Sequence, residues 1–241
     1  MKIVEYFSPN FDKQERSKNS IKTIVIHYTG MQSELESLKR LLNPKSKVSS
    51  HFLISRSGKV YRLVKDKQIA WHAGKSCWGK FKNLNKNSIG IELVNKGHRF
   101  GYTNFKLQQV RSLKKICKKI IKKYNIKKAN IVGHSDIAPL RKIDPGEKFP
   151  WKLLAREKIG IWHSCNKGIL KKKRNIKILD NKEKKIFIKN LKKIGYCFSN
   201  NSKILLTNII KAFQRRYRSE LISGKLDEEC AIIAKNLIKK L

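Results

Sequence analysis

Two histidines and one aspartate stand where they could hold a metal ion. His27 ends the apolar segment 21–29 and His134 ends the apolar segment 130–134, while Asp144 follows in a proline-rich loop. The ends of neighbouring strands deliver side chains into a shared crevice. Two imidazoles and one carboxylate, with a fourth position left for water, suit a catalytic zinc ion. The spacing matches no compact zinc motif, so hydrogen-bonded core histidines are the alternative.

Glu92 and Lys142 could supply the proton transfer and the positive charge that such a site needs. Glu92 interrupts the otherwise apolar segment SIGIELV at 88–94. An unpaired buried carboxylate is costly, so it requires a cation, a metal ion or a water network. Lys142 precedes Asp144 by two residues, and in an extended segment both side chains face the same side. A structural ion pair at Glu92 and an ordinary surface lysine at 142 are the alternatives.

A mixed α/β domain is predicted to position these residues. Alternation, β-branched content and turn signals predict strands, and apolar side chains three and four residues apart predict an amphipathic helix. The expected elements are strands at 21–29, 88–94 and 130–134, a hairpin over 52–64 that turns at Ser57-Gly58, and a helix over 106–124. Strands mixed with helices in this order indicate one α/β domain that ends near residue 163.

The charge of the chain is its most unusual global property. Its 241 residues carry 57 Lys and Arg against 17 Asp and Glu, a net charge of +40. This balance suggests a polyanionic partner. Only 12 of the basic residues are Arg, the residue favoured for bidentate contacts to nucleic acid, and no nucleic-acid-binding motif is visible. We therefore expect no specific nucleic acid, and salt-dependent DNA binding is kept as a lesser alternative.

Targeting and redox signals are sparse. No apolar run approaches the roughly 18 residues that a membrane span needs, and the first twenty residues show neither an apolar signal region nor a lipidation cysteine. Five scattered cysteines without a C-x-x-C pair argue against a disulfide scaffold and against a cysteine-ligated zinc. Free cysteines fit a reducing compartment, and Cys117 is expected to be buried in the predicted helix.

The composition changes after residue 163. Eleven of the residues between 171 and 193 are basic, and helices are expected at about 182–194, 203–218 and 227–240. The second of these carries apolar residues at helical spacing: Ile204, Leu205, Ile209, Ile210 and Phe213. The pattern indicates a small appended bundle. Since this tail contains no histidine, we expect no catalytic group in it.

Six ordered segments between residues 20 and 163 resemble the N-acetylmuramoyl-L-alanine amidase type 2 family: IVIHYTG, SSHFLI, AWHAG, SIGIELVN, VGHSDIAPLRKIDPG and FPW. That family includes phage lysozymes and peptidoglycan recognition proteins. The AmiD-like branch is the most similar, because the tail also resembles its helical peptidoglycan-binding-like domain. The resemblance implies a mixed central sheet flanked by helices, with a catalytic domain over 1–170 and a three-helix domain over 180–241.

The resemblance also assigns roles to single residues. It implies one zinc ion per chain on His27, His134 and Asp144, a catalytic acid at Glu92 and an oxyanion-stabilising cation at Lys142. The implied reaction is hydrolysis of the amide between L-alanine and the lactyl group of N-acetylmuramic acid, or of its 1,6-anhydro form. All five residues are retained, which disfavours the alternative of a non-catalytic cell-wall-binding protein.

Three further residues are assigned to substrate. Trp71 and His72 in AWHAG resemble a wall of the substrate groove, and Arg141 could bind a peptide carboxylate. A half-buried core ring is the alternative for Trp71, and His51 is expected to be structural.

The role of the tail and the location of the chain stay open to test. We expect the tail to hold polymer or to support the catalytic domain, so that a chain ending near residue 175 still hydrolyses small muropeptides. Family resemblance favours the cell envelope, and the missing leader leaves the cytoplasm open. The choice between polymer and anhydro-muropeptide, and the oligomeric state, are also left open.

Overall fold

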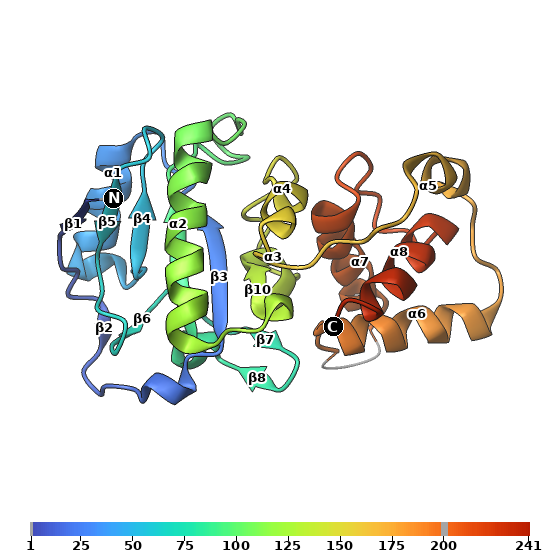
Figure 1. The fold of residues 1–241 in the computed structure, drawn as a ribbon, viewed down its shortest axis with the longest axis horizontal. Helices are drawn as coiled ribbons and strands as arrows, with labels where there is room; N and C mark the ends of the chain where they lie inside the picture. The colour runs from blue at the N-terminus through green and yellow to red at the C-terminus, as the bar shows by residue number, and fades with distance from the viewer. Residues whose placement is uncertain (1, 199–201) are drawn as a thin grey trace.

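The computed structural model describes residues 2–198 and 202–241 and is built on a six-stranded mixed sheet (Figure 1). The strand order is β1-β5-β4-β9-β3-β10; β4 and β5 run antiparallel, and the other neighbours are parallel. The strands are β1 Ile3–Glu5, β3 Thr23–Tyr28, β4 Phe52–Ile54, β5 Val60–Arg62, β9 Ser88–Leu93 and β10 Ile131–Gly133. This confirms the predicted mixed sheet and the hairpin between β4 and β5.

Helix α2, Leu107–Tyr124, covers one face of this sheet (Figure 1). Its side chains Val110, Leu113 and Ile120 are buried in one cluster with Ile24 and Ile91 of the central strands. The 3.6-residue periodicity of the sequence therefore predicted the contact face of this helix as well as its extent. Helix α1, Glu34–Leu42, was not predicted; Ser33 caps it by accepting the Glu36 N–H.

Short elements complete this part of the chain. Two small antiparallel pairs join β2 Phe11–Asp12 to β6 Ile69–Ala70, and β7 Cys77–Trp78 to β8 Phe81–Lys82. Helices α3, His134–Ile137, and α4, Trp151–Arg156, lie between the sheet and the tail (Figure 1). Single 3₁₀ turns occupy Lys18–Ser20, Pro44–Ser46, Leu84–Asn87 and Lys128–Asn130.

In its described residues the tail folds as a bundle of four helices: α5 Lys167–Lys173, α6 Asn181–Ile194, α7 Lys203–Tyr217 and α8 Glu228–Ile238. The last three match the predicted segments, whereas α5 was missed. Phe187, Leu191, Phe213 and Leu237 form its buried centre. Ile204, which was predicted on the apolar face of α7, is 70% exposed because it lies in the first turn of that helix, away from the centre.

One hydrophobic core runs through the bundle and the sheet part. Val132 and Ile137 beside the sheet belong to the same buried cluster as Tyr196 and Phe213 of the bundle. The Trp78 ring packs edge-on against Tyr196, with 5.0 Å between the ring centroids. The predicted domain boundary between residues 170 and 180 thus stays a prediction, because packing is continuous across it.

A disulfide between Cys77 and Cys197 also joins the two parts. This corrects the expectation against disulfides: the partners are 120 residues apart, and only the fold brings their Cα atoms within 6.0 Å. Cys117, Cys165 and Cys230 are free, and Cys117 is buried as expected. Disulfides persist in oxidising compartments, so the argument for a reducing compartment loses its basis. Within the described residues, no helix has both the length and the apolarity to cross a lipid bilayer.

Candidate active site

The pairing of three parallel strands brings the predicted metal ligands to one edge of the sheet. β3 pairs with β9 so that His27 lies opposite Glu92, and β10 pairs with the other side of β3. His134 follows β10 directly as the first residue of α3. In parallel strands the carboxyl ends share one edge, which is where open α/β sheets bind ligands. The inference from strand ends therefore placed these residues together.

Three buried atoms converge at this edge. The Nδ1 atoms of His27 and His134 lie 3.0 Å apart, and each lies 3.1 Å from Oδ2 of Asp144. His27 is 1%, His134 4% and Asp144 7% exposed. Among the described residues this is the group of His, Cys, Asp and Glu side chains that could hold a metal ion. Donor atoms this close leave a point about 2 Å from all three, which is the length of zinc–nitrogen and zinc–oxygen bonds.

The Nε2 atoms of His27 and His134, which point away from the triad, also have hydrogen-bond partners. Nε2 of His27 lies 3.0 Å from Nδ1 of His72, and Nε2 of His134 lies 3.2 Å from the carbonyl oxygen of Ala73. Partners of this kind fix the tautomer and the ring orientation of metal-binding histidines. The segment around residues 72 and 73 therefore supports both rings from behind.

His72, predicted to contact substrate, lies directly behind the triad. Its ring is buried, and its Nε2 lies 3.1 Å from the Ser88 hydroxyl while Nδ1 faces His27. Strand β9 makes room for it with Gly90, where a Cβ atom would lie 2.4 Å from the ring. The structure thus puts His72 behind a proposed metal ligand, and its contact with substrate stays a prediction. Sequence reasoning missed Ser88 and Gly90, although a glycine inside a buried strand is a signal of close approach.

Burial and mutual contact set the charge states of the triad. Burial, together with the neighbouring His134, lowers the pKa of His27 to about 4. Burial disfavours the charged form of Asp144, but the two histidines outweigh it and hold the pKa of this carboxyl well below its usual range. At neutral pH the site therefore presents a neutral His27 imidazole and a carboxylate, the forms that bind metal ions.

Glu92 has the properties of a proton carrier. Burial and, to a smaller extent, the charge of Asp144 raise its pKa to about 8, against an opposing effect of Lys142. Its Oε2 atom is shielded from solvent and has no hydrogen-bond partner within residues 2–198 and 202–241. A carboxyl group that titrates near neutral pH beside a metal-type cluster suits general acid–base chemistry.

The remaining predicted residues lie at varied positions around the triad. Lys142 is half-buried, and its charge acts on both His27 and Glu92. The exposed Arg141 donates from Nη2 to the carbonyl oxygens of Ala73 (3.2 Å) and Lys75 (2.6 Å). Trp71 is half-buried, and its indole N–H donates to Asp12. Lys142 is thus close enough to influence the triad, while Arg141 and Trp71 keep substrate binding as a prediction.

His51 is buried and hydrogen-bonded, as expected of a structural residue. It is fully buried, its Nδ1 accepts the N–H of Gly90, and its Nε2 lies 2.7 Å from the Arg16 guanidinium. Burial, together with the charge of Arg16, lowers its pKa to about 3.

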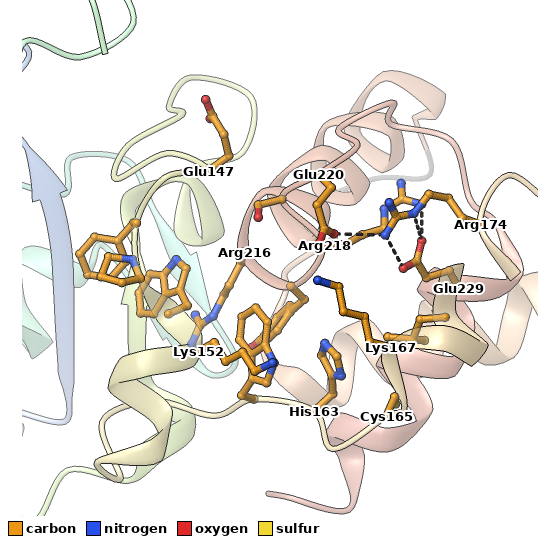
Figure 2. A pocket seen from close by; sticks show the side chains of 17 residues that line it. Glu147, Lys152, His163, Cys165, Lys167, Arg174, Arg216, Arg218, Glu220 and Glu229 are labelled. Atoms are coloured by element: carbon orange, nitrogen blue, oxygen red, sulfur yellow. Dashed lines mark hydrogen bonds and ion pairs between the residues drawn. The ribbon is translucent and has the colours of Figure 1, made fainter. Parts of the chain in front are cut away.

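A separate cavity of about 270 Å³ lies between α4 and the bundle (Figure 2). Lys152, His163 and Lys167 line it together with Arg216, and none of the triad residues does. The cavity therefore lies outside the candidate metal centre.

Residues 17–147 match the N-acetylmuramoyl-L-alanine amidase family. The chain belongs to this family. The chain is 35% identical to the N-acetylmuramoyl-L-alanine amidase AmiD of Escherichia coli, over 91% of this chain and 83% of AmiD. It is 36% identical to the 1,6-anhydro-N-acetylmuramyl-L-alanine amidase AmpD of Haemophilus influenzae, over 60% of this chain and 86% of AmpD.

Solved structures of this amidase family extend the match to the bundle. E. coli AmiD in complex with anhydro-N-acetylmuramic acid-L-Ala-D-gamma-Glu-L-Lys superposes with a TM-score of 0.80 at 33% identity, covering 95% of this chain and 92% of AmiD. AmpDh3 of Pseudomonas aeruginosa in complex with an anhydromuramic pentapeptide also gives 0.80, at 29% identity and 96% coverage of both chains. These matches confirm the predicted enzyme class, its fold and the AmiD-like branch.

Proposed function

We propose that this amidase uses one zinc ion, held by His27, His134 and Asp144, to hydrolyse the bond between L-alanine and the lactyl group of N-acetylmuramic acid or its 1,6-anhydro form. The convergence of three buried donor atoms within 3.1 Å of one another carries this proposal. The anhydro-muropeptide ligands of E. coli AmiD and P. aeruginosa AmpDh3 support the substrate class.

The donor set fits zinc. Two imidazole nitrogens and one carboxylate oxygen are ligands that zinc prefers, and a catalytic zinc site keeps a fourth position for water or substrate. Within the described residues the group consists of these three side chains, which suits a site whose fourth position is left for water or substrate. When bound, zinc supplies Lewis-acid polarisation of the scissile carbonyl and activation of water.

The side chains around the triad would do the rest of the chemistry. Glu92 would accept a proton from the attacking water at its carboxylate and pass it to the nitrogen of the leaving L-alanine. Lys142 would stabilise the negative charge that develops on the carbonyl oxygen. We assign His72 to orienting His27, and keep Trp71 and Arg141 as proposed contacts to substrate.

The test combines metal analysis with product analysis. The purified protein is expected to hold one zinc ion, to lose turnover on chelation and to regain it with zinc. His134→Ala should lose both metal and turnover, whereas the control His163→Ala, a histidine on the wall of the separate cavity, should keep both. Mass analysis of products from sacculi and from soluble anhydro-muropeptides identifies the bond cut and the preferred substrate. Full metal and full turnover in His134→Ala would contradict the proposal.

We also propose that the bundle holds the polymer. A groove of about 780 Å³ runs between α6 and α7, with Phe187, Leu206 and Ile210 among its apolar lining residues. Four lysines line it as well, namely Lys177, Lys184, Lys203 and Lys225. Its acidic residue, Asp227, is paired with Arg218. Positive charge beside apolar surface suits an acidic wall component, and its binding would weaken with salt.

A further inference from the structure

We propose that Arg216 and Tyr196, both contributed by the bundle, are positioning residues for the zinc ligands and act through Asp136. This inference rests on the proposed zinc site and adds to it a function for the tail that is distinct from holding polymer. The bundle would hold in place the one-turn helix on which His134 stands.

Both bundle residues donate hydrogen bonds to the carboxylate of Asp136. Nη1 of Arg216 donates to its Oδ2 atom over 2.6 Å, and the Tyr196 hydroxyl donates to its Oδ1 atom over 2.7 Å. Asp136 is 2%, Arg216 3% and Tyr196 2% exposed. Each oxygen of the carboxylate thus has a partner from the bundle, in a place from which water is excluded.

Asp136 in turn holds the segment that carries the ligands. Its Oδ2 atom accepts the backbone N–H of Gly133 over 2.8 Å, which closes the turn that begins α3 at His134. The N–H of Ser135, the second residue of that helix, donates to the carbonyl oxygen of Asp144 over 2.8 Å. The position of α3 therefore bears on two of the three proposed zinc ligands.

Arg216 is fixed in its own right. Its Nη2 atom donates to the carbonyl oxygen of Ile131 in β10 over 2.8 Å. Its guanidinium lies 4.2 Å from the centre of the Trp151 ring, and Figure 2 shows the side chain reaching from α7 toward α4. The planar guanidinium donates hydrogen bonds to strand β10 and to helix α3 at the same time, and so it sets the angle between them. A lysine, with a single ammonium group, could not hold this geometry. Partners behind metal ligands typically change metal affinity or activity by about 10- to 100-fold.

The alternative is a buried ion pair that only stabilises the contact between bundle and sheet. Arg218 provides a matched control, because it is 2% exposed, lies two residues from Arg216 and pairs with Asp227 and Glu229 inside the bundle. Tyr124 matches Tyr196 in the same way, since its hydroxyl donates over 2.6 Å to the buried Asp66 of the sheet part.

The experiment compares Arg216→Lys with Arg218→Lys, and Tyr196→Phe with Tyr124→Phe, in the full-length chain. Zinc affinity is measured by competition with a chromophoric chelator, thermal unfolding is followed on the metal-free protein, and turnover is measured with and without excess zinc. We expect Arg216→Lys to lower zinc affinity about 10-fold or more, Tyr196→Phe to lower it less, and both controls to stay within about twofold of the parent. Excess zinc should restore part of the turnover of Arg216→Lys.

Equal zinc affinity in Arg216→Lys and Arg218→Lys, at similar losses of thermal stability, would overturn the positioning role and leave the proposed function intact. Absence of zinc binding by the parent chain would overturn the proposed function and this inference with it. The Tyr196→Phe variant keeps its ring against Trp78, so a folded protein is expected even if Arg216→Lys unfolds.

Discussion

One glutamate of the sheet part and one of the bundle have opposite surroundings. In the bundle, Glu229 is 1% exposed and is paired with Arg174 over 2.7 Å and with Arg218 over 3.3 Å. In the sheet part, Glu92 has its Oε2 atom buried without a hydrogen-bond partner among the described residues. Removing one partner of a buried ion pair destabilises a fold, whereas a carboxylate without such a partner keeps its capacity to exchange a proton. The difference separates residues that hold the molecule together from residues that are available for chemistry.

The sharpest test of this contrast removes one carboxylate from each part. Glu92→Gln should fold and keep zinc but lose about 10²- to 10⁴-fold in kcat, because an amide cannot carry the proton. Glu229→Gln should retain kcat and lose thermal stability, because it leaves Arg174 and Arg218 short of a partner. Steady-state kinetics and thermal unfolding of both variants provide the measurement. Unchanged kcat in Glu92→Gln would make this residue a bystander.

Removal of the bundle tests how far the two parts depend on each other. A chain ending at residue 175 keeps all the predicted catalytic residues, and the sequence alone predicted that it would stay active. The structure changes that expectation. The cut removes Arg216 and Tyr196, the two bundle residues that donate to Asp136, and it uncovers Trp78 and Ile137.

Loss of one partner of a buried ion pair destabilises by about 3–5 kcal/mol. We therefore expect the shortened chain to unfold at lower denaturant concentration and to bind zinc more weakly. Denaturant titration and zinc competition would show this. A shortened chain with unaltered stability and zinc affinity would mean that the parts are independent.

Acid should weaken the sheet part through its buried histidines. Burial lowers the pKa of His27 to about 4, that of His51 to about 3, and that of His72 well below its ordinary value of 6.5. Below pH 6.5 the unfolded chain binds protons at these positions and the folded chain does not, so stability is complete above that pH and is lost as pH falls toward 4. Glu92, with its pKa raised to about 8, acts in the opposite direction.

The effect of the three histidines exceeds the opposite effect of the one carboxyl group. The metal-free protein is therefore expected to lose roughly 1–3 kcal/mol of folding stability per pH unit as pH falls from 6 to 5. Urea unfolding at several pH values measures this slope. Glu92→Gln should make the slope steeper, since it removes the opposing proton. A slope that is flat in both proteins would contradict the burial of neutral histidines.

The smallest expected effect concerns the lysines of the bundle groove. Replacing Lys177, Lys184, Lys203 and Lys225 by glutamine should reduce retention on insoluble peptidoglycan several-fold at low salt and little at high salt. Turnover of soluble muropeptide should not change. A matched set of four glutamines at exposed lysines of α2, namely Lys115, Lys118, Lys119 and Lys122, controls for total charge. Equal losses in both sets would make retention a property of net charge alone.

Local signals in the sequence predicted the central strands, helix α2 and three helices of the tail, whereas α1 and α5 were missed. Strand periodicity placed His27 and His134 at strand ends, and the structure adds the parallel pairing that puts Glu92 beside His27. The contacts that complete the site join residues distant in the chain. The Arg216–Asp136 pair spans 80 residues and the disulfide spans 120, and no local pattern encodes either one. The contact of His72 with His27 was not predicted, because the space for the His72 ring is provided by Gly90, which is distant from it in sequence.

The disulfide encloses a covalent loop from residue 77 to residue 197, and this loop contains Glu92, His134 and Asp144 but not His27. Cleavage of one peptide bond inside the loop, for instance after the exposed Lys96 or Arg99, would therefore release no fragment. Such a nicked protein would migrate as one species in a non-reducing gel and as two after reduction. The residues proposed to bind zinc would then be divided between two peptides that a single sulfur–sulfur bond keeps together.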